Sequence, residues 1–171
     1  MSAGGDTTGL ARWEELARRA AEAVGEGSDT RELSQLLSFQ IGETPYAVAV
    51  ESVREIVRLC PITPIPRVSR DVRGVISLRG EILQVIDLRL RLGLPPAEFT
   101  KASRIVVVQD EEGHVAGLLV DEVREVLRVA SDEIGAAAAG DAQGLVSGLC
   151  TRGEAFVSLL DLERTLEVRD A

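Results

Sequence analysis

Apolar and polar residues alternate in short blocks along most of the chain. Runs of four to eight β-branched and leucine residues, bounded by glycine, proline or polar turns, predict strands. The stretch 72–91 contains two such runs, which form a hairpin that turns at Arg79-Gly80-Glu81. Taken from this hairpin alone, Arg79 is most simply a solvated turn residue. Many short strands with few helices are typical of barrels or sandwiches.

The pattern of the hairpin occurs a second time. Val53-Arg54-Glu55 and the four residues after it recur without a gap at 123–129, and the Arg-Gly-Glu at 79–81 recurs at 152–154. An apolar-apolar-Asp-Leu motif closes each copy. Two copies are too few for a solenoid. They predict a mainly β fold made of a duplicated pair of small five-stranded barrels, of the SH3 or OB type.

Helical patterns are confined to the ends of the chain. Residues 1–9 are rich in glycine, serine and threonine, a composition that predicts disorder. Apolar residues then recur at helical spacing and predict an amphipathic helix over 10–24, with Trp13 on its apolar face. A short helical turn is expected over 30–37, and a short closing helix over 162–168.

Composition and charge argue against binding to nucleic acid or to membranes. The chain has 171 residues and a formal net charge of -9, which opposes binding to nucleic acid and to anionic membranes. It has no apolar run near the roughly 20 residues that span a bilayer, and its N-terminus does not resemble a signal peptide. Cys60 and Cys150 belong to no metal or redox motif. We therefore expect a soluble cytoplasmic protein with free thiols.

Reactive groups are sparse. His114 is the single histidine and stands in a polar turn, so it forms no zinc site with two distant cysteines. An enzyme that uses Cys60 or His114 remains the rival interpretation, although nothing in the spacing supports one. We therefore expect no catalytic residue, no metal and no cofactor, and a binding module that uses strand edges and apolar patches.

The order of the motifs resembles the CheW family, the bacterial chemotaxis coupling proteins. The motifs are F-Q-I-G-x-x-P-Y-A-V-A-V-x-x-V-R-E-I from Phe39, V-R-G-V-I-S-L-R-G-E-I-L-Q-V-I-D-L-R from Val72, V-A-G-L-L-V-D-E-V-R-E-V-L from Val115 and L-L-D-L-E-R-T-L from Leu159. The resemblance implies a CheW-like domain over 38–168, preceded by an extension over 1–37. The first barrel would span about 38–95 and the second about 104–162, with interleaving of the two left open.

The resemblance also implies a function. Members of the family are non-enzymatic adaptors that bind the cytoplasmic tips of chemoreceptors and the regulatory domain of a CheA-type histidine kinase. They act in the cytoplasm and are recruited to membrane-associated receptor arrays. Two variants of this role stay open. One is a scaffold of a chemotaxis-like pathway that controls surface motility or gene expression, and the other is a ring-capping adaptor that binds kinase without receptor.

The family pattern assigns roles to individual positions. The receptor-binding residues would be Val53, Glu55, Ile56 and Arg79. Arg79 would then be a functional residue, not merely a solvated turn residue. The residues that dock the kinase or shape the hairpin would be Gly74, Ser77, Leu78, Gly80, Gln84, Gly117, Val120 and Asp121. Two positions depart from the pattern, since Ser77 replaces the usual asparagine and Gln84 the usual proline. Gln84 thereby restores a backbone donor that proline lacks.

Overall fold

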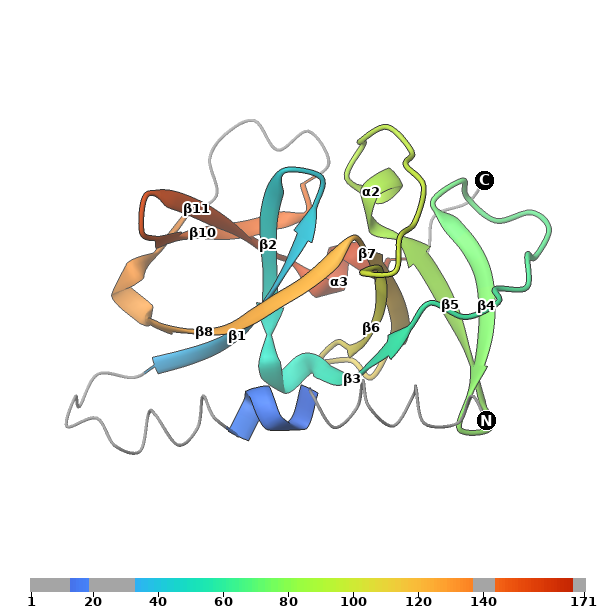
Figure 1. The fold of residues 1–171 in the computed structure, drawn as a ribbon, viewed down its shortest axis with the longest axis horizontal. Coiled ribbons are helices and arrows are strands. Elements are labelled where there is room, and N and C mark those ends of the chain that lie inside the picture. The colour runs from blue at the N-terminus through green and yellow to red at the C-terminus, as the bar shows by residue number, and fades with distance from the viewer. Residues whose placement is uncertain (1–12, 19–32, 137–143, 168–171) are drawn as a thin grey trace.

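The computed structural model describes residues 13–18, 33–136 and 144–167, and strands dominate it (Figure 1). A six-stranded sheet has the order β8-β1-β2-β11-β10-β9. Its strands are β1 (Leu33–Ile41), β2 (Thr44–Ala49), β8 (Glu122–Ala130), β9 (Ile134–Ala136), β10 (Val146–Arg152) and β11 (Ala155–Leu160).

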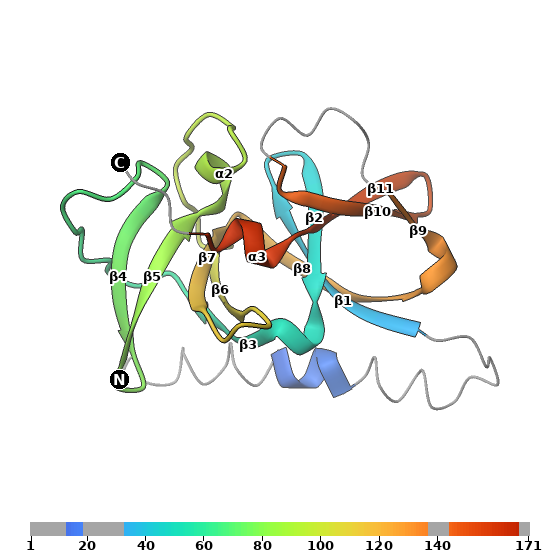
Figure 2. The ribbon, with the colours of Figure 1, turned by 180° about the vertical axis from the view of Figure 1, so that it is seen from behind.

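A five-stranded sheet of order β3-β6-β7-β5-β4 lies beside it (Figures 1 and 2). Its strands are β3 (Val53–Arg58), β4 (Val72–Leu78), β5 (Glu81–Asp87), β6 (Arg104–Gln109) and β7 (Val115–Val120). The described helices are 13–18, the 3-10 turns η1 (Val50–Ser52) and η2 (Ser131–Glu133), α2 (Leu88–Arg91) and α3 (Leu162–Thr165). The predicted mainly β fold with two sheets is confirmed, and the three-residue β9 brings one sheet to six strands.

The two sheets interleave along the chain, which is the alternative left open for the barrels expected at about 38–95 and 104–162. β1 and β2 pair into the sheet of β8 to β11, whereas β6 and β7 pair into the sheet of β3 to β5. Each repeat thus contributes its first two strands to the sheet of the other repeat. The hydrophobic pattern predicts where a strand runs but does not specify which strand it pairs with.

The exchange happens at two short crossovers. The single turn η1 leads from β2 in one sheet to β3 in the other, and Asp121 alone separates β7 from β8. The strands that follow these crossovers, β3 and β8, carry the two Val-Arg-Glu motifs. The equivalent strands therefore begin at the seam between the sheets, where both halves of the molecule meet.

The N-terminal boundary also differs from the expectation. β1 begins at Leu33 and pairs with both β2 and β8, so the helical turn expected through Leu37 is wrong over the described residues 33–37. Strand pairing on both sides outweighs a weak local helix signal. Of the helix expected over 10–24, the structure describes 13–18, which is helical, while residues 1–9 lie outside the described part. The closing helix ends at Thr165, and Val168 is not described.

Three apolar clusters hold the molecule together. One cluster belongs to the five-stranded sheet and contains Val85 and Val107, and another belongs to the six-stranded sheet and contains Leu127 and Val157. The largest cluster joins the two sheets. Its buried members include Phe39 and Val48 from one sheet, Val106 and Leu118 from the other, and Trp13 from the N-terminal helical segment.

The repeat is visible in local geometry as well. Asp87 accepts a hydrogen bond from the backbone N–H of Leu90 and caps α2, and Asp161 caps α3 through the backbone N–H of Arg164. An aspartate at this position satisfies an otherwise unpaired donor of the first turn. The repeated Asp-Leu motif therefore marks two equivalent strand-to-helix junctions.

Candidate partner-binding surface

The turn of the β4–β5 hairpin consists of Arg79 and Gly80. Both have positive φ, 51° and 81° respectively, and Leu78 faces Glu81 across the turn. Two successive positive φ values are characteristic of a type I′ turn, which matches the twist of a two-residue hairpin. Glycine adopts this conformation freely, whereas a side chain at position 79 makes it costly. An arginine at this costly backbone conformation suggests that its side chain has a role.

Glu55 holds that side chain. Arg79 Nε donates to Glu55 Oε1 at 3.1 Å, and the hydrogen bond and charge of Glu55 raise the pKa of Arg79. The Glu55 side chain is only 11% exposed, whereas that of Arg79 is 64% exposed. The buried carboxylate thus orients the arginine while most of the guanidinium stays available to solvent. A second pair, Arg54 with Glu81 at 3.6 Å, also links β3 to the β4–β5 hairpin.

The second repeat contains a matching pair. Arg152 Nη2 lies 3.4 Å from Glu125 Oε2, and these residues correspond to Arg79 and Glu55 in the repeated motifs. Here both side chains are about half exposed. The turn also differs, because Arg152 pairs with Ala155 as the last residue of its strand. The second copy has one residue more between its Arg-Gly-Glu and its aspartate, and its arginine accordingly lies in the strand instead of the turn.

Three of the predicted receptor-binding residues lie on β3 and the fourth, Arg79, lies in the hairpin turn beside them, but they are not equally accessible. Val53 and Ile56 are 8% and 5% exposed and belong to the cluster that joins the two sheets. Trp13 and Ala17 of the N-terminal helical segment pack in the same cluster. Arg79 is therefore the one exposed member of this group, and the apolar members are covered within the chain.

The predicted kinase-docking or hairpin-shaping residues divide by exposure. Ser77, Gly80 and Gln84 are exposed, and Leu78 is half-buried. The remaining members are buried or occupied in local contacts, and they are Gly74, Gly117, Val120 and Asp121.

Two of these four residues, Gly74 and Asp121, have clear structural roles. A Cβ on Gly74 would lie 2.1 Å from the carbonyl oxygen of Thr63, whose backbone bridges to Val75. The segment around Thr63, which follows the edge strand β3, therefore pairs with the opposite edge strand β4 and closes the five-stranded sheet at this glycine. Asp121 accepts a hydrogen bond from the backbone N–H of Gly42 at 2.7 Å and pairs with Arg89, which fixes the crossover into β8.

The outer face of the β4–β5 hairpin carries an exposed apolar side chain within one of the apolar runs that predict strands. Ile82 is 74% exposed and lies opposite Ser77, with Gln84 two positions further on the same face. Alternation along Glu81-Ile82-Leu83-Gln84-Val85 could have revealed this, since Leu83 and Val85 point inward. Phe156, 63% exposed, lies at the equivalent place on the β10–β11 hairpin, opposite Thr151.

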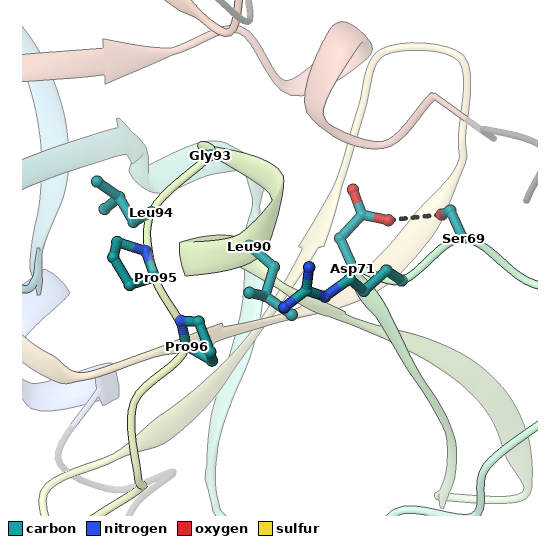
Figure 3. Close-up of a pocket in the computed structure, with 8 residues that line it drawn as sticks. Ser69, Asp71, Leu90, Gly93, Leu94, Pro95 and Pro96 are labelled. Carbon is teal, nitrogen blue, oxygen red and sulfur yellow. Dashed lines mark hydrogen bonds between the residues drawn. The ribbon is translucent and has the colours of Figure 1, made fainter.

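At the other end of the β4–β5 hairpin, a buried arginine connects the two halves. Arg91 is 2% exposed, pairs with Asp71, and donates to the backbone carbonyl of Thr165 at 2.7 Å. A hollow of about 500 Å³ lies beside this pair (Figure 3). It is lined by Ser69, Arg70, Asp71, Leu90, Gly93, Leu94, Pro95 and Pro96. The hollow therefore borders a structural ion pair, far along the hairpin from Arg79.

Other reactive side chains are engaged locally. Asp110, Glu112 and His114 place their ligand atoms within 4.8 Å of one another in one turn. The Asp110 carboxylate already accepts from the backbone N–H of His114 and contacts its ring Nδ1 at 3.0 Å. Burial raises the pKa of the Cys150 thiol, which disfavours a nucleophilic thiolate. Among the described residues, every helix is too short or too polar to cross a bilayer.

Comparison with known proteins agrees with this geometry. The family model described as CheW-like domain matches residues 35–170. The chain is 33% identical to the "Chemotaxis protein CheW" of Thermotoga maritima, over 78% of this chain and 87% of that protein. It is 38% identical to the protein of the same name in Rhizobium meliloti over 58% of this chain, and there the match spans 64% of the relative's length. The crystal structure of the scaffolding protein TtCheW from Thermoanaerobacter tengcongensis aligns with a TM-score of 0.71 and 30% identity, covering 76% of this chain and 90% of that chain.

Proposed function

Because the chain belongs to the CheW-like domain family, we propose that it is a non-enzymatic adaptor that couples chemoreceptor tips to a CheA-type histidine kinase. An adaptor needs separate surfaces for its partners and no turnover chemistry. The observation that carries this proposal is the β4–β5 hairpin, whose tip presents Arg79 on a buried carboxylate, next to an exposed apolar face. Charged groups at the edge of such a surface set specificity, while apolar anchors supply affinity.

Two parts of the hairpin would bind different partners. The tip, with Arg79 beside Glu55 and the covered residues Val53 and Ile56, would receive the chemoreceptor. The family resemblance implies a helical receptor tip, and an amphipathic helix suits an apolar groove bordered by charges. The outer face, with Ser77, Ile82 and Gln84, would dock the regulatory domain of the kinase.

The buried members of the second predicted group would act through the fold. Gly74, Gly117 and Val120 shape the five-stranded sheet that supports the hairpin, and Asp121 fixes the crossover between the sheets. In this proposal the protein works in the cytoplasm and joins receptor arrays through its receptor contacts.

The experiment that tests the proposal mixes the protein with receptor-containing membranes and the kinase, and measures sedimented kinase and its autophosphorylation. Recovery of kinase in the pellet, with activity that responds to receptor ligand, supports coupling. Binding to kinase alone, without receptor, would instead support a ring-capping adaptor. Coupling to receptors whose pathway controls surface motility or gene expression would keep the adaptor role and change its output.

A further inference from the structure

The N-terminal helical segment 13–18 covers the seam between the two sheets. Trp13 is 7% exposed and Ala17, one helical turn later, packs against the same cluster. That cluster contains Val53 and Ile56 of β3, with Val126 of β8 packed against it. In both views the segment runs along the side of the molecule where η1 enters β3 (Figures 1 and 2). The helix thus covers strands from both repeats.

The same segment carries a negative charge toward the hairpin tip. After the hydrogen bond and charge of Glu55, the charge of Glu14 also contributes to raising the pKa of Arg79. Glu14 is exposed, so solvent screens this interaction strongly. The arginine at the tip nevertheless lies in the field of an acidic residue on the covering helix.

Together these contacts indicate what kind of helix fits the surface that segment 13–18 covers. It is a short helix that presents a large apolar side chain and a small one at i and i+4, with a carboxylate beside the first whose charge acts on Arg79. Residues four apart lie on one face of a helix, so Trp13 and Ala17 form a single apolar stripe. An amphipathic helix from a partner would need the same surface, and the two helices could not both cover it.

We propose that segment 13–18 is a tethered occupant of the receptor-binding surface and must leave before the receptor tip can bind. The inference rests on the proposed function, because it takes the receptor tip as the competing helix. A surface that is free for only part of the time binds its partner more weakly, in proportion to the fraction that is open. The extension therefore lowers the affinity for receptor and leaves the outer face of the hairpin free for the kinase.

The test uses Trp13, the one tryptophan of the chain, as a reporter in the full-length protein. A soluble receptor-tip fragment is titrated into the wild type while tryptophan emission is recorded. Displacement exposes the indole to water, so the emission maximum is expected to move to longer wavelength in proportion to binding. An unchanged emission maximum at saturation with receptor fragment would overturn the inference.

Matched variants give a second readout. Trp13→Ala is expected to bind the receptor fragment on the order of tenfold more tightly, as when an open fraction near one tenth rises to one. Trp13→Phe keeps an aromatic anchor and is expected to stay near the wild-type affinity. Equal or weaker receptor binding by Trp13→Ala, with wild-type kinase binding as the check on folding, contradicts the inference.

Failure of the inference is distinguishable from failure of the proposed function. If wild type and Trp13→Ala both bind receptor with equal affinity and the wild-type emission stays unchanged, the helix is a structural cover and the adaptor role stands. If neither protein binds the receptor fragment, while kinase binding is intact, receptor coupling itself is wrong and this inference falls with it.

Discussion

Glu55 and Arg79 lie 24 positions apart in the chain, yet Arg79 Nε donates to Glu55 Oε1 at 3.1 Å. The corresponding residues of the second repeat, Glu125 and Arg152, lie 3.4 Å apart. The duplication thus preserved an ion pair between the Val-Arg-Glu strand and the Arg-Gly-Glu hairpin. The pair differs in burial between the copies, which favours the first copy as the one that holds an arginine in a fixed orientation.

The charge of Arg79 can be separated from its backbone conformation. Asparagine tolerates positive φ and is favoured in type I′ turns, so Arg79→Asn should keep the hairpin and remove the charge. We expect the thermal midpoint to change by less than about 4 °C, while coupling of receptor to kinase is lost. Arg79→Lys, which keeps the charge without the planar fork, should couple partially. Full kinase control by Arg79→Asn in the co-sedimentation assay would contradict a functional role for the arginine.

The apolar face of the hairpin can be tested at its most exposed position. Ile82→Ser changes a side chain that is 74% exposed, so the fold should tolerate it. We expect binding to the kinase regulatory domain to weaken by roughly tenfold or more, the behaviour of an interface anchor. Phe156→Ser, at the equivalent place of the other repeat, is the matched comparison in a titration by calorimetry. If Ile82→Ser binds the kinase like the wild type, the outer face is not the docking surface.

Two glycines of the hairpin should respond differently to alanine. At Gly74 a Cβ meets the Thr63 carbonyl at 2.1 Å, whereas at Gly80 no atom lies within 4 Å. Gly74→Ala combines a backbone clash with an unfavourable φ, and we expect it to lower the free energy of unfolding by about 3 kcal/mol or more. Gly80→Ala pays only the turn strain, about 1 kcal/mol. Urea denaturation measures both, and equal losses would contradict the closure of the sheet at Gly74.

The buried Arg91 should be essential for stability. Removal of its charge in Arg91→Met leaves Asp71 without its cationic partner and the carbonyls of Thr165 and Glu167 without the donor that Arg91 supplies. Breaking a buried pair from one side costs about 3–5 kcal/mol. Arg54→Met, which removes an exposed partner of Glu81, should cost less than about 1 kcal/mol. If chemical denaturation shows that Arg91→Met lowers the free energy of unfolding as little as Arg54→Met does, the contacts of Arg91 with Asp71, Thr165 and Glu167 are dispensable for stability.

The same ion pair predicts a dependence on acid. Burial alone would raise the pKa of Asp71, but the hydrogen bond from Ser69 and the charge of Arg91 outweigh it, so the pKa lies below its ordinary 3.8. A carboxylate with a lowered pKa stabilises the fold above its unfolded pKa, and that contribution disappears as the pH falls through the folded pKa. The difference in unfolding free energy between wild type and Asp71→Asn should therefore shrink below about pH 4.

Urea titrations at several pH values between neutral and acid measure this difference. Glu43→Gln, which changes an exposed carboxylate of the β1–β2 turn, serves as the control. A wild-type advantage over Asp71→Asn that stays constant down to the acid limit would contradict the assigned role of the pair.

Local rules explain what could be predicted from the sequence. Apolar runs between glycines located the strands, the Arg-Gly pair located the hairpin turn, and the two Asp-Leu motifs marked equivalent helix starts. Each of these features depends on neighbours within a few positions, so a pattern in the chain is enough. The family resemblance predicted that Arg79 binds the receptor, whereas the strand pattern alone predicted only a solvated turn residue.

What the sequence by itself determined is therefore the set of strands, their twofold repetition and the family. Only the tertiary structure decided how strands were exchanged between the two sheets, because pairing depends on partners that lie far away in the chain. It also decided that Arg91 is buried, that Glu55 orients Arg79, and that Trp13 belongs to the same buried cluster as Val53 and Ile56. Burial and ion pairing arise when distant segments exclude water from one another, and no local pattern encodes that event.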